Sequence, residues 1–111
     1  MSKTVQIANK TIGENQNCFI TAEVGINHNG SLDLAKKLID IAVETGCDAV
    51  KFQKRTVDVV YTKEELEKER ESVFGFTNGD LKRGLEFGLE EYKEIDNYCK
   101  KKGIIWYASC W

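Results

Sequence analysis

The chain contains 111 residues, of which 41% are hydrophobic and 31% charged, and its formal net charge at pH 7 is −2. This length allows one domain or part of one, and the composition is that of an ordinary globular protein. The small net charge argues against nucleic acid or an anionic membrane as a partner, and no apolar run approaches the roughly 20 residues of a membrane span. Because the N-terminus lacks the apolar core of a signal peptide, we expect a cytoplasmic location.

The N-terminal part of the chain predicts a hairpin followed by the first strand of a larger unit. Residues 4–12 favour a small β-hairpin that turns at Asn9–Lys10. After a polar loop, residues 18–23 predict a buried strand. We therefore divide the chain into an N-terminal hairpin, residues 1–17, and a second unit, residues 18–111.

An amphipathic helix is expected next. Ser31 is a good N-cap, Asp33 suits the first turn, and Gly46 ends the helix. Residues 49–53 then predict a second strand, and a strand, a helix and a strand within about 36 residues form a βαβ unit with parallel strands. The apolar stripe of the helix has a period of 3.6 and consists of Leu34, Ala35, Leu38, Ile39, Ala42 and Val43.

Residues 54–78 interrupt the alternation of strands and helices. The charged run 63–70 can form only a solvated helix, and residues 74–79 (FGFTNG) read as a loop before a short helix at 80–87. A connection this long between a strand and a helix is uncommon and is often a binding loop or a lid.

The last two predicted elements are a helix at 89–102, which Gly103 ends, and a strand at 104–109. The inner face of this helix would carry Tyr92, Ile95, Tyr98 and Cys99. The four cysteines have no C-x-x-C spacing, and we expect small core residues in a reducing compartment, with a metal site or a disulfide as the alternative. They are Cys18, Cys47, Cys99 and Cys110.

Side-chain alternation along the three strands separates an apolar face from a polar one. Ile20 and Ala22 share the apolar face of the first strand, whereas the other face turns polar near the carboxyl ends of all three strands. In a (β/α)₈ barrel, helices cover the apolar face of the strands, and polar side chains line the opening at their carboxyl ends, where the active site lies. The alternation in this chain predicts the same arrangement, and we call the opening the mouth. The residues expected to converge at this mouth are Glu23, Lys51, Gln53 and Ser109.

Three motifs resemble the sialic acid synthase family, whose members make N-acetylneuraminic, legionaminic and pseudaminic acids and spore-coat polysaccharide precursors. They are residues 22–31 (AEVGINHNGS), 50–53 (VKFQ) and 108–111 (ASCW), in order and at plausible spacing. The resemblance implies an α/β fold, namely the N-terminal portion of a (β/α)₈ TIM barrel with three parallel barrel strands and an N-terminal β-hairpin. A complete barrel of this kind needs about 250 residues.

The resemblance also implies a reaction. The family condenses phosphoenolpyruvate (PEP) with an N-acyl sugar aldehyde such as N-acetylmannosamine and releases phosphate. Carried over residue by residue, Lys51 and Ser109 would bind PEP, Glu23 and Gln53 would contact the sugar, and Glu23 would be the catalytic residue that handles protons. These residue types suit an anionic substrate and an aldehyde that becomes an alcohol.

The same resemblance implies a divalent metal, Mn²⁺ or Mg²⁺, and a homodimer for the complete enzyme. The family's metal ligands are histidines on later barrel strands, so we expect no metal ligands in this chain, whose only histidine is His28. We therefore expect this chain alone to be inactive.

Other interpretations stay open from the sequence alone. Glu23 and Lys51 can be a structural ion pair, Ser109 an ordinary hydroxyl, and His28 a residue that organises its loop by hydrogen bonds. Asn78 matches a substrate-contacting asparagine of the family only loosely. The chain can also be a non-catalytic half-barrel that binds anions or assembles with its own copies. A flavodoxin-like domain is less favoured, because the loop after Glu23 lacks the chemistry of a phosphate cradle.

Overall fold

The computed structural model describes residues 3–111 and contains three small sheets and five helices. The strands are β1 (Thr4–Ile7), β2 (Lys10–Gly13), β3 (Thr21–Gly25), β4 (Ala49–Lys54), β5 (Glu69–Ser72), β6 (Gly75–Thr77) and β7 (Ile105–Cys110). The helices are α1 (Leu32–Glu44), α2 (Val57–Val60), α3 (Lys63–Glu67), α4 (Asn78–Leu85) and α5 (Leu89–Lys102).

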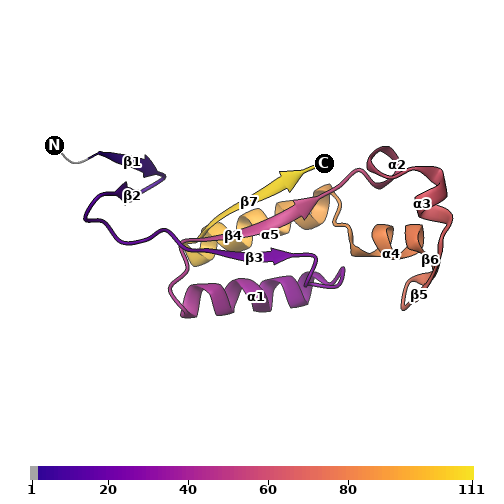
Figure 1. Ribbon diagram of the computed structural model, residues 1–111. Coiled ribbons are helices and arrows are strands. Elements are labelled where there is room, and N and C mark those ends of the chain that lie inside the picture. Colours follow the sequence, from indigo (N-terminus) through magenta and orange to yellow (C-terminus); the bar gives the residue numbers. More distant parts are fainter. Residues whose placement is uncertain (1–2) are drawn as a thin grey trace.

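The central sheet is parallel and has the strand order β3-β4-β7 (Figure 1). Helices α1 and α5 pack side by side against it and share one core with the apolar face of the strands. Burying this core supplies most of the driving force for folding. Its fully buried centre consists of Val50 and Phe52 from β4, Ala35 and Ile39 from α1, and Ile95 and Cys99 from α5.

Both long helices begin and end as the sequence predicts. The Ser31 hydroxyl accepts the backbone N–H of Leu34 at the start of α1. At the end of α5, Gly103 adopts φ +74°, a left-handed conformation that glycine tolerates best. These caps satisfy groups that a helix end leaves unpaired, so the two helices have defined lengths over the sheet.

The first strand of the sheet differs from its prediction. It begins at Thr21 rather than Cys18, because Thr21 is the first residue that lies opposite β4, at Ala49. The alternation had placed Ile20 on the apolar face of this strand. In the structure Ile20 precedes the strand and is 53% exposed, so that prediction is wrong. The hairpin before it turns one residue earlier than expected, since Ile7 pairs with Lys10.

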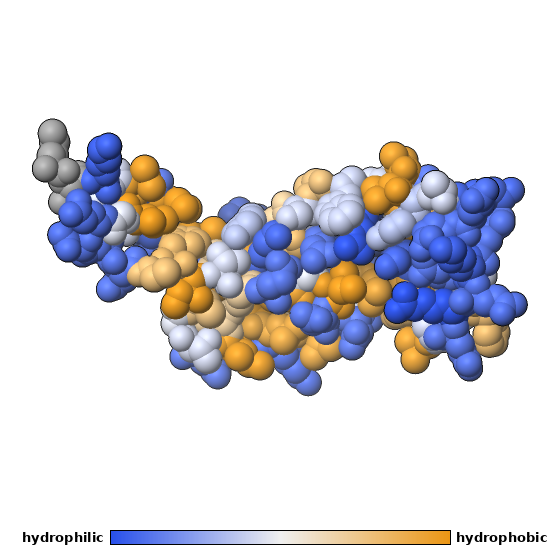
Figure 2. All heavy atoms as spheres, viewed as in Figure 1, coloured by the Kyte–Doolittle hydropathy of each residue, from blue (hydrophilic) through white to orange (hydrophobic). Residues whose placement is uncertain are grey.

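The connection between β4 and α5 contains a hairpin that the sequence did not reveal. Helix α3 ends at Glu67, and the charged residues after it form β5, which pairs with β6. The carboxylate of Asp80 accepts the N–H groups of Phe76 and Thr77 and so fixes the step from β6 into α4. The surface over this connection is largely hydrophilic in Figure 2.

The cysteine prediction is correct only in part. All four cysteines are free, and Cys99 is buried in the core while Cys47 is half-buried. Cys18 and Cys110 are exposed: Cys18 precedes β3, and Cys110 is the last residue of β7. They are therefore not core residues.

The N-terminal hairpin forms its own two-stranded sheet at one end of an elongated molecule of 56 × 29 × 21 Å (Figure 1). An ion pair of 3.3 Å between Lys10 Nζ and Asp48 Oδ1 links it to the turn before β4. Over residues 3–111, no helix is long and apolar enough to cross a membrane.

Candidate functional site

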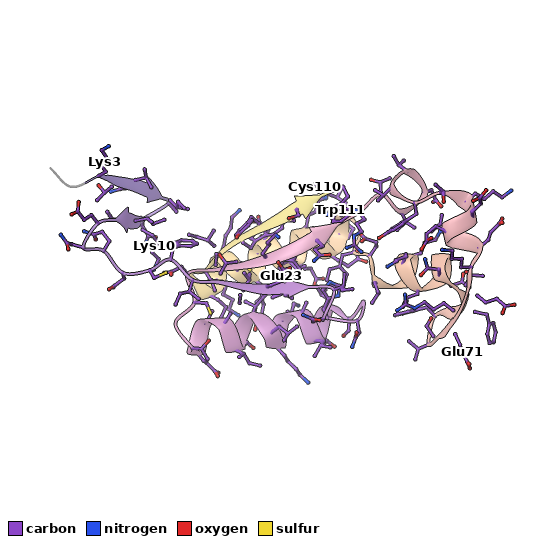
Figure 3. All side chains as sticks on the ribbon, viewed as in Figure 1. Lys3, Lys10, Glu23, Glu71, Cys110 and Trp111 are labelled. Carbon is purple, nitrogen blue, oxygen red and sulfur yellow. The ribbon has the colours of Figure 1, made fainter. Side chains whose placement is uncertain are left out.

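The candidate site lies on the face of the central sheet opposite α1 and α5. The register places Glu23 beside Lys51 and Gln53 beside Ser109, and all four alternate with the core residues of their strands. The predicted convergence at the carboxyl side of three parallel strands is therefore present in the structure. Figure 3 labels Glu23 on β3 and Trp111 just beyond β7.

Glu23 and Lys51 form an ion pair of 3.3 Å between Oε2 and Nζ. Their side chains are 47% and 29% exposed, so solvent screens the pair. Partly exposed pairs of this kind contribute only about 0–1 kcal/mol to stability. A structural role alone therefore gives little reason for these two charges, and the lysine remains accessible to an anion.

The turn after Glu23 brings the backbone close to the site. Gly25 has φ +48°, and a Cβ built on it would lie 2.9 Å from Glu23 Oε1 and 3.4 Å from Gln53 Nε2. A side chain at this position would press on the Glu23 carboxylate and lie in van der Waals contact with the Gln53 amide. Glycine thus serves two needs here, a left-handed backbone and room for two polar side chains.

His28 organises this turn from the inside, as the sequence analysis favoured over metal ligation. It is 1% exposed, stacks on Phe87 at 4.0 Å between ring centroids, and accepts the Gly30 N–H at Nδ1. Burial lowers the pKa of His28, and a hydrogen bond with the Gly25 backbone opposes this shift. The imidazole is therefore held neutral within the loop.

Two further residues belong to this face although the sequence analysis did not select them. Arg55 Nη2 donates to Gln53 Oε1 over 2.8 Å, and the guanidinium lies 4.6 Å from the centre of the Trp111 ring. The signal was the same alternation carried two residues further, since Arg55 follows Lys51 and Gln53, and Trp111 follows Ser109.

One carboxylate fixes the end of β4, and it comes from Glu86, near the C-terminal end of the connection between β4 and α5. Glu86 Oε2 accepts the backbone N–H of Arg55 at 3.1 Å and the Lys54 ammonium at 3.3 Å. Lys54 Nζ also donates to the Arg55 carbonyl. These contacts fix the backbone of Arg55, from which its side chain extends to the site.

Asn78 lies elsewhere. It is 5% exposed and donates from its amide to the Glu65 carbonyl and carboxylate, which links α4 to α3. In this arrangement the asparagine tethers two helices of the long connection.

Residues 3–111 do not by themselves fit a metal site. Within the part of the chain that the structure describes, no group of three or more His, Cys, Asp or Glu side chains could hold a metal ion. His28 is committed to its loop, and Glu23 pairs with Lys51.

Comparison with known proteins gives matches at the levels of sequence and fold. The NeuB family matches residues 38–111. The N-acetylneuraminate-9-phosphate synthase of Homo sapiens is 41% identical over 100 residues, which cover 88% of this chain and 28% of that protein. The spore coat polysaccharide biosynthesis protein SpsE of Bacillus subtilis is 39% identical over 104 residues, covering 94% and 28%.

The crystal structure of the N-acetylneuraminic acid synthetase from Leptospira borgpetersenii matches all of this chain and 35% of its own, with a TM-score of 0.78 and 28% identity. This match and the parallel sheet confirm the predicted fold class, the N-terminal portion of a TIM barrel with a hairpin before it. The chain spans about 28% of the length of the curated relatives named above. Since the family match covers more than half of its residues, the chain belongs to the NeuB family, among whose relatives are sialic acid, legionaminic acid and spore coat synthases.

Proposed function

We propose that this chain forms the first part of the catalytic barrel of a synthase that condenses PEP with an N-acyl sugar aldehyde, such as N-acetylmannosamine. The methylene carbon of PEP forms a bond to the aldehyde carbon, water adds to the former enol carbon, and phosphate leaves. The observation that carries the proposal is the row of Glu23, Lys51 and Gln53 on the open face of a sheet that matches a sialic acid synthetase.

Each residue has a task in this proposal. Lys51 supplies the fixed positive charge that a phosphate and a carboxylate require, and Ser109 donates a hydroxyl to the same anion. Glu23 and Gln53 contact the sugar. Glu23, within ion-pair distance of Lys51, is the group that moves a proton to or from the reacting oxygen.

The remainder of the pocket has to come from residues beyond this chain. In residues 3–111, β3 and β7 each pair on one side only, and the ion pair at the centre of the site is partly exposed. The proposal therefore includes an inactive isolated chain, a divalent metal held by residues outside it, and a homodimer as the state of the complete enzyme.

A second candidate is a non-catalytic half-barrel that binds anions or assembles with its own copies. The observation that favours it is the pair of open sheet edges, which present unpaired backbone groups to a partner strand. This candidate predicts anion binding through Lys51 without turnover.

The test is a chimera in which this chain replaces the matching 100 residues of the human N-acetylneuraminate-9-phosphate synthase. Phosphate release and the nonulosonic acid product are measured with PEP, Mn²⁺ and N-acetylmannosamine, free and phosphorylated. We expect turnover. A chimera that folds and binds PEP but gives no product would favour the non-catalytic candidate.

The Lys51→Ala variant of this chimera assigns the anion site. A charge-assisted hydrogen bond contributes about 1.5–3 kcal/mol, so we expect the KM for PEP to rise about tenfold or more. Lys37→Ala, which removes an exposed lysine from α1, is the matched control and should leave the KM unchanged. Equal kinetics for both variants would refute the role of Lys51.

A further inference from the structure

The amide of Gln53 is held from one side by Arg55. The donor is Arg55 Nη2, and the acceptor is Gln53 Oε1 at 2.8 Å. An arginine side chain carries five N–H donors and no acceptor. The amide atom that faces Arg55 is therefore the oxygen, and the NH₂ group points the other way.

The other direction leads toward Glu23. Gln53 Nε2 and Glu23 Oε1 both lie within 3.4 Å of the point that a Gly25 Cβ would occupy. The NH₂ group thus lies on the β3 side of the open face, near the carboxylate that pairs with Lys51. This is the side on which the proposed sugar would bind.

Arg55 is itself fixed by the fold. Its guanidinium lies over the Trp111 ring, and its backbone N–H donates to Glu86. Its Nε is buried and has no hydrogen-bond partner among the residues that the structure describes. Nε–H and one Nη2–H share an edge of the guanidinium, and the amide of Gln53 brings only one oxygen to that edge.

We propose that Arg55 is a positioning residue that fixes Gln53 as a hydrogen-bond donor toward the site. The substrate atom that Gln53 contacts is then an acceptor, such as a hydroxyl or carbonyl oxygen of the N-acyl sugar. The identity of that substrate rests on the proposed function, whereas the orientation of the amide rests on Arg55 alone.

The kinetic test uses the chimera described above. Arg55→Ala and Gln53→Ala should each raise the KM for the sugar about threefold to tenfold, the effect of one hydrogen bond between uncharged groups. The KM for PEP should stay close to that of the parent chimera. Because both substitutions remove the same contact, the double variant should be no worse than either single one.

Two variants separate positioning from a general loss of structure. Arg55→Lys keeps the charge but loses the planar fork, so it should restore little of the lost affinity for the sugar. Arg83→Ala removes an exposed arginine whose only described ion pair is with Asp58, and it should leave both KM values unchanged. Additive effects of Arg55→Ala and Gln53→Ala, or an unchanged KM for the sugar in Arg55→Ala, would overturn the proposal.

A stability measurement tests the contact without any activity. Gln53→Glu offers a carboxylate that can accept from both Nε and Nη2 of Arg55. Because the second carboxylate oxygen would lie near Glu23, the informative quantity is the coupling: Gln53→Glu should give a higher melting temperature relative to its parent when Arg55 is present than it does in the Arg55→Ala background. If the chimera is inactive but this coupling appears, the proposed function fails and the orientation of Gln53 stands. If the coupling is absent, the orientation fails even when the chimera turns over.

Discussion

His28 holds the turn after β3 through a lone pair. Its Nδ1 accepts the Gly30 N–H at 3.0 Å, and its ring is buried against Phe87. Protonation at Nδ1 would remove the acceptor and place a charge in an apolar setting. The turn that carries Gly25 next to the site therefore depends on a neutral imidazole.

A pH dependence of stability follows from this residue. Burial lowers the pKa of His28 below its usual 6.5, so the unfolded chain takes up the proton first as the pH falls. The stability that depends on neutral His28 is complete above about pH 6.5 and is lost as the pH falls from there through the folded-state pKa.

The comparison variant is His28→Asn, which keeps an acceptor for Gly30 and cannot titrate. The difference in unfolding free energy between the parent chimera and this variant should shrink from pH 7.5 to pH 5, as measured by urea unfolding. A difference that stays constant over this range would contradict the assignment.

Helices α1 and α3 begin with the same kind of N-cap, but the two caps differ in their importance for the stability of the fold. Ser31 accepts the Leu34 N–H at the start of α1, and Thr62 accepts the Glu65 N–H at the start of α3. Helix α1 buries Ala35, Ile39 and Ala42, whereas α3 buries no residue. Helix α1 is thus part of the core, and α3 belongs to the surface connection.

We expect Ser31→Ala to lower the global unfolding free energy by about 1 kcal/mol, the usual cost of a lost N-cap. Thr62→Ala should lower it less, because local opening of α3 does not require the core to unfold. Chemical denaturation of the two chimera variants is the measurement, and equal losses would show that α3 unfolds together with the sheet.

For the whole molecule, we expect the isolated 111-residue chain to form no sialic acid. Two strands of its sheet have a described neighbour on one side only, and the candidate site is open to water. Open edges favour association, so light scattering should detect species larger than a monomer. Phosphate release from PEP and N-acetylmannosamine with Mn²⁺, above that of Mn²⁺ alone, would contradict this prediction.

The central sheet could be predicted because its strands and two long helices carry strong local signals. The caps at Ser31 and Gly103 are examples, and the alternation along β4 placed Lys51 and Gln53 correctly. The β5–β6 hairpin could not, because its charged residues show no alternation and Asp80 fixes it from the next helix. Arg55 was missed because the predicted strand ended at Gln53.

Glu86 joins the two ends of the connection that follows β4. Its one carboxylate joins the residues where the chain leaves the sheet, Lys54 and Arg55, to the segment through which it returns. Residues 56–85 lie between the two ends that this carboxylate joins, so a change in their number leaves the contact itself intact. The end of β4, and with it the site, can therefore keep its place when the connection after it changes.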